Sequence, residues 1–142
     1  MDIVSKDKRS EMMSRIKSRN TKPEIFIRKA LFALGFRYRL DSKVLGIKPD
    51  IVLRKWNTCI FVHGCFWHRH NNCKLASIPK SNSKFWEKKF DENVSRDKKT
   101  IDILQENHWQ VGIIWECAIR NKGTDFGSLS KLIKGNRSWS IP

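Results

Sequence analysis

The chain has 142 residues, a length that predicts one domain with a continuous core and leaves no room for a second independent one. Its 29 lysine and arginine residues against 14 aspartate and glutamate residues give a formal net charge of +15, which favours nucleic acid as the partner. The N-terminus shows no long apolar run, lipidation signal or basic amphipathic helix. We therefore expect no membrane role and a cytoplasmic protein whose four cysteines are reduced.

Residues 1–20 are predicted to form a basic N-terminal arm, and residues 21–142 the folded domain. The arm offers too little apolar surface to fix a short helix by burial, since its strong apolar anchors are only Met12, Met13 and Ile16. We expect the arm to become ordered on DNA. The alternative is a solvated basic tail.

The first firm helix is predicted at residues 22–34. Thr21 and Glu24 have the spacing of a capping box, and Pro23 is tolerated in a first helical turn. Gly35 can then end the helix in a left-handed conformation.

Three strands are predicted next. Residues 36–40 alternate apolar and basic side chains, as a half-exposed strand does. Residues 50–53 and 58–62 follow, and the second of these segments is apolar enough to be a central strand.

The C-terminal half predicts a long helix at residues 83–107, a buried strand at 109–115 and a final helix near 126–134. The long helix carries an apolar stripe of Trp86, Phe90, Val94, Ile101 and Leu104. The order α-β-β-β-α-β-α predicts an α/β fold, a single domain with a mixed central sheet flanked by helices.

The stretch from Val62 to Cys73 holds three of the four histidines and two of the four cysteines. Such clustering favours a tetrahedral metal site over ordinary core thiols, and we expect a closed, structural zinc site with four protein ligands. The predicted ligands are Cys65, His70, Cys73 and Cys117. His68 could replace His70, and Cys59 could replace Cys117.

A second site is predicted around Asp50, which opens a strand and can hold a magnesium ion against a phosphate. His63 and His68 follow the next strand, and neutral imidazoles can take or give a proton during hydrolysis. Glu24 has two interpretations. It either only caps its helix or also orients water on the metal.

Phe66 and Trp67 are two large rings between a predicted zinc ligand and His68. They are either buried or suited to wedging between DNA bases, most easily where the pair is a mismatch. Trp86 has the same two interpretations, because it also begins the apolar stripe of the long helix.

A family resemblance follows from motifs that occur in this order: Pro49-Asp50, His63-Gly64-Cys65-Phe66-Trp67-His68, Phe85-Trp86, Asn93-Val94-x-Arg96-Asp97 and Trp115-Glu116-Cys117. Over roughly residues 8–120 the chain closely resembles the very-short-patch repair endonucleases. The resemblance implies a fold related to type II restriction endonucleases and a structural zinc. It also implies magnesium-dependent nicking of double-stranded DNA 5′ to the thymine of a T·G mismatch, which arises when 5-methylcytosine deaminates.

The resemblance also implies residue roles. Asp50 and the Val62 carbonyl would hold magnesium, and Glu24 would organise hydration. His68 would activate water, and His63 would contact the phosphate or metal-bound water. The implied zinc ligands are Cys65, His70, Cys73 and Cys117. The implied DNA contacts are a major-groove wedge of Phe66, Trp67 and Trp86, and a minor-groove insertion by Met13. In one departure, two residues separate His70 from Cys73 where some relatives have one.

Two rival functions remain at this stage. One is a restriction-type nuclease that cuts paired DNA on the same scaffold. The other is a non-catalytic zinc-stabilised DNA-binding protein, which would leave Asp50, His63 and His68 unexplained. We expect a monomer, with mismatch-repair proteins as candidate partners.

Overall fold

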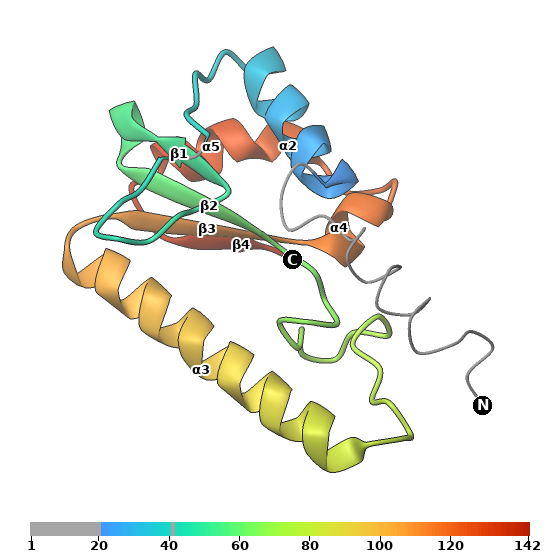
Figure 1. Cartoon of the computed structure of the whole chain (residues 1–142). Helices are drawn as coiled ribbons and strands as arrows, with labels where there is room; N and C mark the ends of the chain where they lie inside the picture. Colours follow the sequence, from blue (N-terminus) through green and yellow to red (C-terminus); the bar gives the residue numbers. More distant parts are fainter. Residues whose placement is uncertain (1–20, 41) are drawn as a thin grey trace.

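The computed structural model describes residues 21–40 and 42–142 (Figure 1). The predicted basic arm, with Met13, lies outside the described residues. The helices are α2 (Lys22–Ala33), α3 (Ser83–Glu106), α4 (Glu116–Arg120) and α5 (Leu129–Lys134). The strands are β1 (Ile51–Leu53), β2 (Thr58–His63), β3 (Gln110–Trp115) and β4 (Trp139–Ile141). No described helix has the length and apolarity needed to span a membrane.

The four strands form one sheet in the order β1-β2-β3-β4. β1 is antiparallel to β2, whereas β2, β3 and β4 run parallel, so the predicted mixed sheet is confirmed. In the parallel pair, His63 at the end of β2 is the register partner of Trp115 at the end of β3. The segments that follow these two strands therefore start side by side at one edge of the sheet.

Helices cover both faces of the sheet, as Figure 1 shows: α2 and α5 on one face and α3 on the other. Side chains of the central strand β2 alternate between the two faces of the sheet. Ile60 therefore points into the core under α2 and α5, and Cys59 points into the core under α3. Leu104 is the fully buried residue that α3 contributes to the second core. A mixed sheet with helices on both faces confirms the predicted α/β fold class.

The predicted first helix is confirmed to within a residue. The Thr21 hydroxyl accepts a hydrogen bond from the backbone N–H of Glu24 at 3.4 Å, and Pro23 occupies the first turn. Gly35 follows with a φ of +91°, the left-handed conformation expected of a residue that ends a helix.

The predicted strand at residues 36–40 is wrong. Only Arg39 pairs there, through two backbone hydrogen bonds with Val52. Phe36 is instead buried in the core with α2, and β1 is only three residues long, so it offers a short partner edge. The alternation of apolar and basic residues in this segment reflects the burial of single side chains and not the pairing of a strand with a neighbouring strand.

Neither α4 nor β4 was predicted, because they are only five and three residues long. β4 is seated by the Trp139 ring, which lies against Gly112 of β3 so closely that a Cβ at this glycine would overlap the indole. Only glycine allows this approach of the two strands.

The predicted stripe of α3 is partly wrong. Leu104 and Phe90 are buried, but Val94 is 45% exposed. The sheet supports only the C-terminal part of α3, and its N-terminal half packs on the loop that follows β2, where the Asn93 side chain donates to the Trp67 carbonyl at 3.2 Å. One helix therefore joins the core to the predicted site.

Candidate active site and metal cluster

The functional side chains gather where β2 ends. His63 continues the face of β2 that α3 covers, two positions after Phe61. The chain then turns back at once, because the N–H of His68 donates to the Gly64 carbonyl and the N–H of His70 donates to the Cys65 carbonyl, both at 3.1 Å. These turns return His68 to the strand end that it has just left.

His63 and His68 form a stacked pair. Their ring centroids are 3.9 Å apart and their planes differ by 4°. His63 is buried, and no described residue is a hydrogen-bond partner for its Nδ1. The pKa of His63 is lowered to about 4, mainly by burial and also by the neighbouring His68, while Asp97 acts in the opposite direction. His63 is therefore neutral at pH 7.

Asp97, from α3, completes this group. Its Oδ2 lies 2.6 Å from Nδ1 of His68. An ionised carboxylate can only accept, so Nδ1 of His68 donates, and in the neutral form of this ring Nε2 then carries the lone pair. Ligand atoms of His63, His68 and Asp97 all lie within 4.8 Å of one another. The sequence motif contained Asp97 but gave it no role, because nothing in a helix sequence tells which carboxylate will meet a distant histidine.

Asp50 lies beside the same strand end. Its Oδ2 accepts a hydrogen bond from the backbone N–H of Val62 at 2.8 Å. Burial raises the pKa of Asp50 from 3.8 to about 6. The Val62 bond opposes that rise, Glu24 adds to it, and His68 and Arg28 oppose it. The Asp50 carboxylate thus interacts electrostatically with Glu24 and His68, and its role as a metal ligand stays a prediction.

Glu24 is buried in the first turn of α2, and its carboxylate binds Arg28 at 3.2 Å. Its backbone N–H is the group that Thr21 caps. The helix cap and the placement of an acid near Asp50 are therefore compatible. The metal-ligand role of the Val62 carbonyl stays a prediction.

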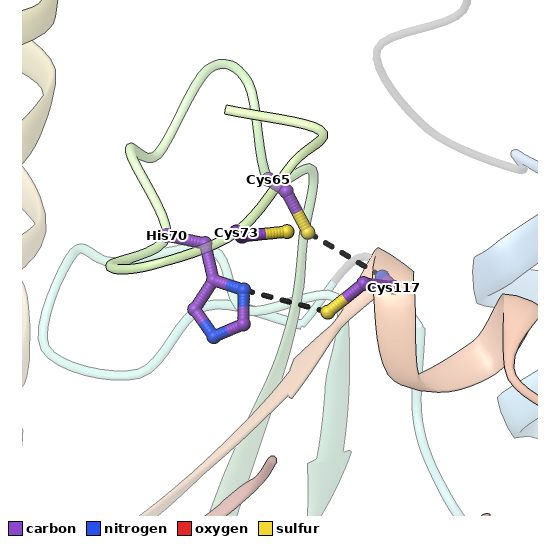
Figure 2. Close-up of side chains that lie close together, drawn as sticks. All are labelled: Cys65, His70, Cys73 and Cys117. Carbon is purple, nitrogen blue, oxygen red and sulfur yellow. Dashed lines mark hydrogen bonds between the residues drawn. The ribbon is translucent and has the colours of Figure 1, made fainter. Parts of the chain in front are cut away.

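A second cluster consists of Cys65, His70, Cys73 and Cys117 (Figure 2). All four ligand atoms lie within 4.8 Å of one another. Sγ of Cys117 is 3.4 Å from Nδ1 of His70, and the N–H of Cys117 donates to Sγ of Cys65 at 3.4 Å. Three thiols and one imidazole at this spacing form a donor set that fits a tetrahedral metal ion.

The structure places His70 and Cys117 in this cluster, and neither His68 nor Cys59, the two alternative ligands that the sequence left open. His68 is occupied with Asp97, and Cys59 is buried in the core under α3, so neither belongs to the cluster. The two-residue spacer before Cys73 is accommodated by Asn72 in a left-handed conformation, with φ of +55°. Burial raises the pKa of Cys65 to about 12, so this thiol needs a cation opposite it to ionise.

The predicted wedge residues form an aromatic cluster. The Phe66 ring meets Trp67 at 5.2 Å and Trp86 at 5.7 Å between centroids, and Phe90 of α3 also packs on it. Arg69 braces the cluster, with its guanidinium 4.0 Å from the Phe90 ring centre and a hydrogen bond to the Phe66 carbonyl. Trp67 is 37% exposed. The rings therefore pack on one another and also present an aromatic surface.

A pocket of about 550 Å³ lies between α3 and β3 next to the histidine pair. Its lining includes His63, His68, Asp97, Ile101 and Trp115. The histidine pair is thus accessible from this side.

Comparison with known proteins agrees with this geometry. A family model described as DNA mismatch endonuclease Vsr matches residues 1–75. The chain is 44% identical over 133 residues to the Type II nicking enzyme V.NmeAIP of Neisseria meningitidis serogroup A, covering 94% of both chains. It is 39% identical over 121 residues to DNA mismatch endonuclease Vsr of Escherichia coli, covering 85% of this chain and 77% of that protein.

The chain belongs to the Vsr family. The resemblance inferred from the motifs is therefore confirmed, and membership makes the chain an endonuclease that acts on DNA. Among solved structures, the catalytic domain of homing endonuclease I-Bth0305I matches 84% of this chain and all of that chain, with a TM-score of 0.58 and 19% identity. The Vsr fold is thus shared with another nuclease.

Proposed function

We propose that the chain nicks one strand of double-stranded DNA 5′ to the thymine of a T·G mismatch and so starts very-short-patch repair of deaminated 5-methylcytosine. The observation that carries this proposal is the Asp97–His68–His63 arrangement next to Asp50, in a member of a DNA mismatch endonuclease family. The names of the relatives, a mismatch endonuclease and a nicking enzyme, support the mismatch and the single-strand cut.

His68 is the proposed general base. Asp97 accepts from Nδ1–H and fixes the tautomer, so Nε2 can take a proton from the attacking water. When the proton arrives, the carboxylate of Asp97 stabilises the imidazolium. His63 stays neutral beside it, so it does not repel the charge that forms on His68. Neutral His63 also offers a hydrogen bond to the phosphate or to the water.

Asp50 is the proposed protein ligand of a magnesium ion, together with the Val62 carbonyl, while Glu24 orients water near it. The fit rests on a buried carboxylate that keeps one oxygen on the Val62 N–H and has a second oxygen for a cation. Burial raises the pKa of Asp50 because it removes water from the carboxylate, and a bound cation would offset this loss. When bound, the ion stabilises the charge of the departing 3′ oxygen.

Zinc is the proposed ion of the Cys65–His70–Cys73–Cys117 cluster, in a structural role. Four protein ligands leave no open position for substrate. The cluster would fasten the loop after β2 to the junction of β3 and α4, where Cys117 lies.

The aromatic cluster is the proposed wedge, with Phe66, Trp67 and Trp86 entering the base stack from the major groove. We propose further that residues 1–20 are an arm that reaches the minor groove with Met13, that residues 21–142 form the nuclease domain, and that the protein acts as a monomer in the bacterial cytoplasm.

A nicking assay on labelled duplexes with each mismatch and a T·A control tests the function. We expect one nick 5′ to the thymine of T·G, with magnesium present and not in chelator. Equal cutting of T·G and T·A duplexes would instead identify a restriction-type nuclease. Tight DNA binding without any magnesium-dependent nick would identify a non-catalytic binding protein.

A further inference from the structure

Trp115 lies between the two functional clusters. It is the last residue of β3, and its indole stacks on the His70 ring with centroids 4.2 Å apart and planes 13° apart. The His63 ring meets the same indole edge-on, at 5.1 Å and 76°. One side chain therefore contacts a histidine of the sulfur cluster and a histidine of the candidate active site.

The contacts continue in both directions. His63 stacks on His68, which binds Asp97 at 2.6 Å. On the other side, Nδ1 of His70 lies 3.4 Å from Sγ of Cys117. Packed rings thus connect the metal cluster to the proposed general base without a gap in the chain of contacts.

The backbone makes this connection stiff. Trp115 and His63 are register partners in the parallel β2–β3 pair, so their side chains leave the same face of the sheet next to each other. Cys117 follows two residues after Trp115, so the indole and a metal ligand are held by one short segment. Trp115 belongs to neither of the two apolar cores, so its packing serves these histidines rather than the core.

We propose that Trp115 is a positioning residue, which transmits the placement of His70 in the metal-loaded cluster to His63 and His68. This inference rests on the proposed nicking function and adds to it a link between metal loading and catalysis. The cluster then supports the geometry of the reaction as well as the loop fold. Small displacements matter here, because a misplacement of about 1 Å can cost about a hundredfold in rate.

The test compares Trp115→Phe and Trp115→Leu with Trp109→Leu. Trp109 precedes β3 and packs against the core under α3, away from both clusters, so it is a matched indole deletion. Nicking of a T·G duplex by the zinc-loaded proteins gives kcat and KM, with zinc content and thermal midpoint measured in parallel. We expect kcat to fall about threefold with Phe and about tenfold or more with Leu, at constant KM and zinc content. Trp109→Leu should keep the parental kcat.

A second readout does not depend on activity. Long-range proton–nitrogen NMR of the zinc-loaded proteins reports the imidazole nitrogens. We expect the His68 signals, and not only those of His63, to shift in Trp115→Phe and to stay in place in Trp109→Leu. A parental His68 spectrum in Trp115→Phe would overturn the proposal.

The kinetic outcomes decide as well. Parental kcat in the folded Phe and Leu variants overturns the proposal. A raised KM at parental kcat overturns it too, since Trp115 would then be a DNA contact. A fall in kcat that is fully explained by a lower zinc content also overturns the proposal, because Trp115 would then only stabilise the metal cluster. If the Leu variant does not fold, the Phe variant decides. A parental protein that nicks no T·G duplex refutes the nicking function, while the NMR comparison still tests the link between the rings.

Discussion

The two histidine-containing groups at the edge of the sheet differ in how their polar atoms are satisfied. In the cluster of Cys65, His70, Cys73 and Cys117, four donor atoms converge on one point and face one another. In the group of His63, His68 and Asp97, the rings stack face to face and line an open pocket. Both take a histidine from the same loop. Residue type alone therefore does not separate the two groups, whereas their surroundings do: one consists of four ligand atoms within 4.8 Å, and the other stacks beside a pocket.

The largest effect is expected from Asp50→Asn. The amide can still accept from the Val62 N–H, but it cannot offer a charged oxygen to a cation. Nicking of the T·G duplex should fall by about 10³-fold or more, the equivalent of several kcal/mol of lost charge stabilisation. Zinc content should be unchanged. Asp91→Asn, on the exposed surface of α3, is the matched control, and a nicking rate near parental in Asp50→Asn would remove Asp50 from the mechanism.

Cys73→Ala should break the closed cluster and leave the histidine pair chemically intact. We expect loss of the bound zinc and a fall in the free energy of unfolding of more than about 3 kcal/mol, measured by denaturant titration. Cys59→Ala removes a buried thiol outside the cluster and should keep the zinc. Retention of a full zinc equivalent by Cys73→Ala would contradict the assignment of this ligand.

The pH dependence of the free energy of unfolding should report the cost of burying the ionised carboxylate of Asp50. Because its pKa is raised from 3.8 to about 6, the folded protein binds a proton more tightly than the unfolded chain does. Stability is therefore lost as pH rises between about 4 and 6, by about 2–3 kcal/mol. Without divalent cations, Asp50→Asn should be more stable than the parent at pH 7.5, with a difference that vanishes near pH 4. Equal stability at pH 7.5 would argue against a desolvated carboxylate.

The smallest effect is expected from Asp97→Asn. The amide oxygen can keep the hydrogen bond to Nδ1 of His68, but it no longer stabilises a protonated ring. We expect kcat to fall roughly tenfold to a hundredfold, with KM and zinc content unchanged. Asp91→Asn again serves as the control. An unchanged kcat would show that His68 works without a carboxylate behind it.

Local signals in the sequence predicted much of this molecule. The cap at Thr21, the proline in the first turn and Gly35 determine α2 through short-range contacts, so its bounds could be predicted. The four cluster residues were predictable because cysteine and histidine are rarely concentrated without a metal. Even so, only the structure separates His70 from His68, since both lie in the same loop.

The missing parts depend on tertiary contacts. Asp97 and Trp115 gain their positions from α3 and from the β2–β3 register, and no spacing within their own segments encodes either. The alternation at residues 36–40 predicted a strand, but a ladder also needs a partner edge of sufficient length. Val94 is exposed because α3 leaves the sheet there, a divergence that a helical period does not reveal.

The way α3 is anchored has a consequence for protein engineering. Leu104 lies in the core and Asp97 binds the proposed base. The two residues are seven positions apart on one side of α3, which is about 10 Å along the helix, or roughly two turns. A repacked core that rotated or slid this helix would move the carboxylate by a similar amount. Substitutions of Leu104 that aim at a higher melting temperature should therefore also be screened for kcat, because the same helix supports the core and positions Asp97.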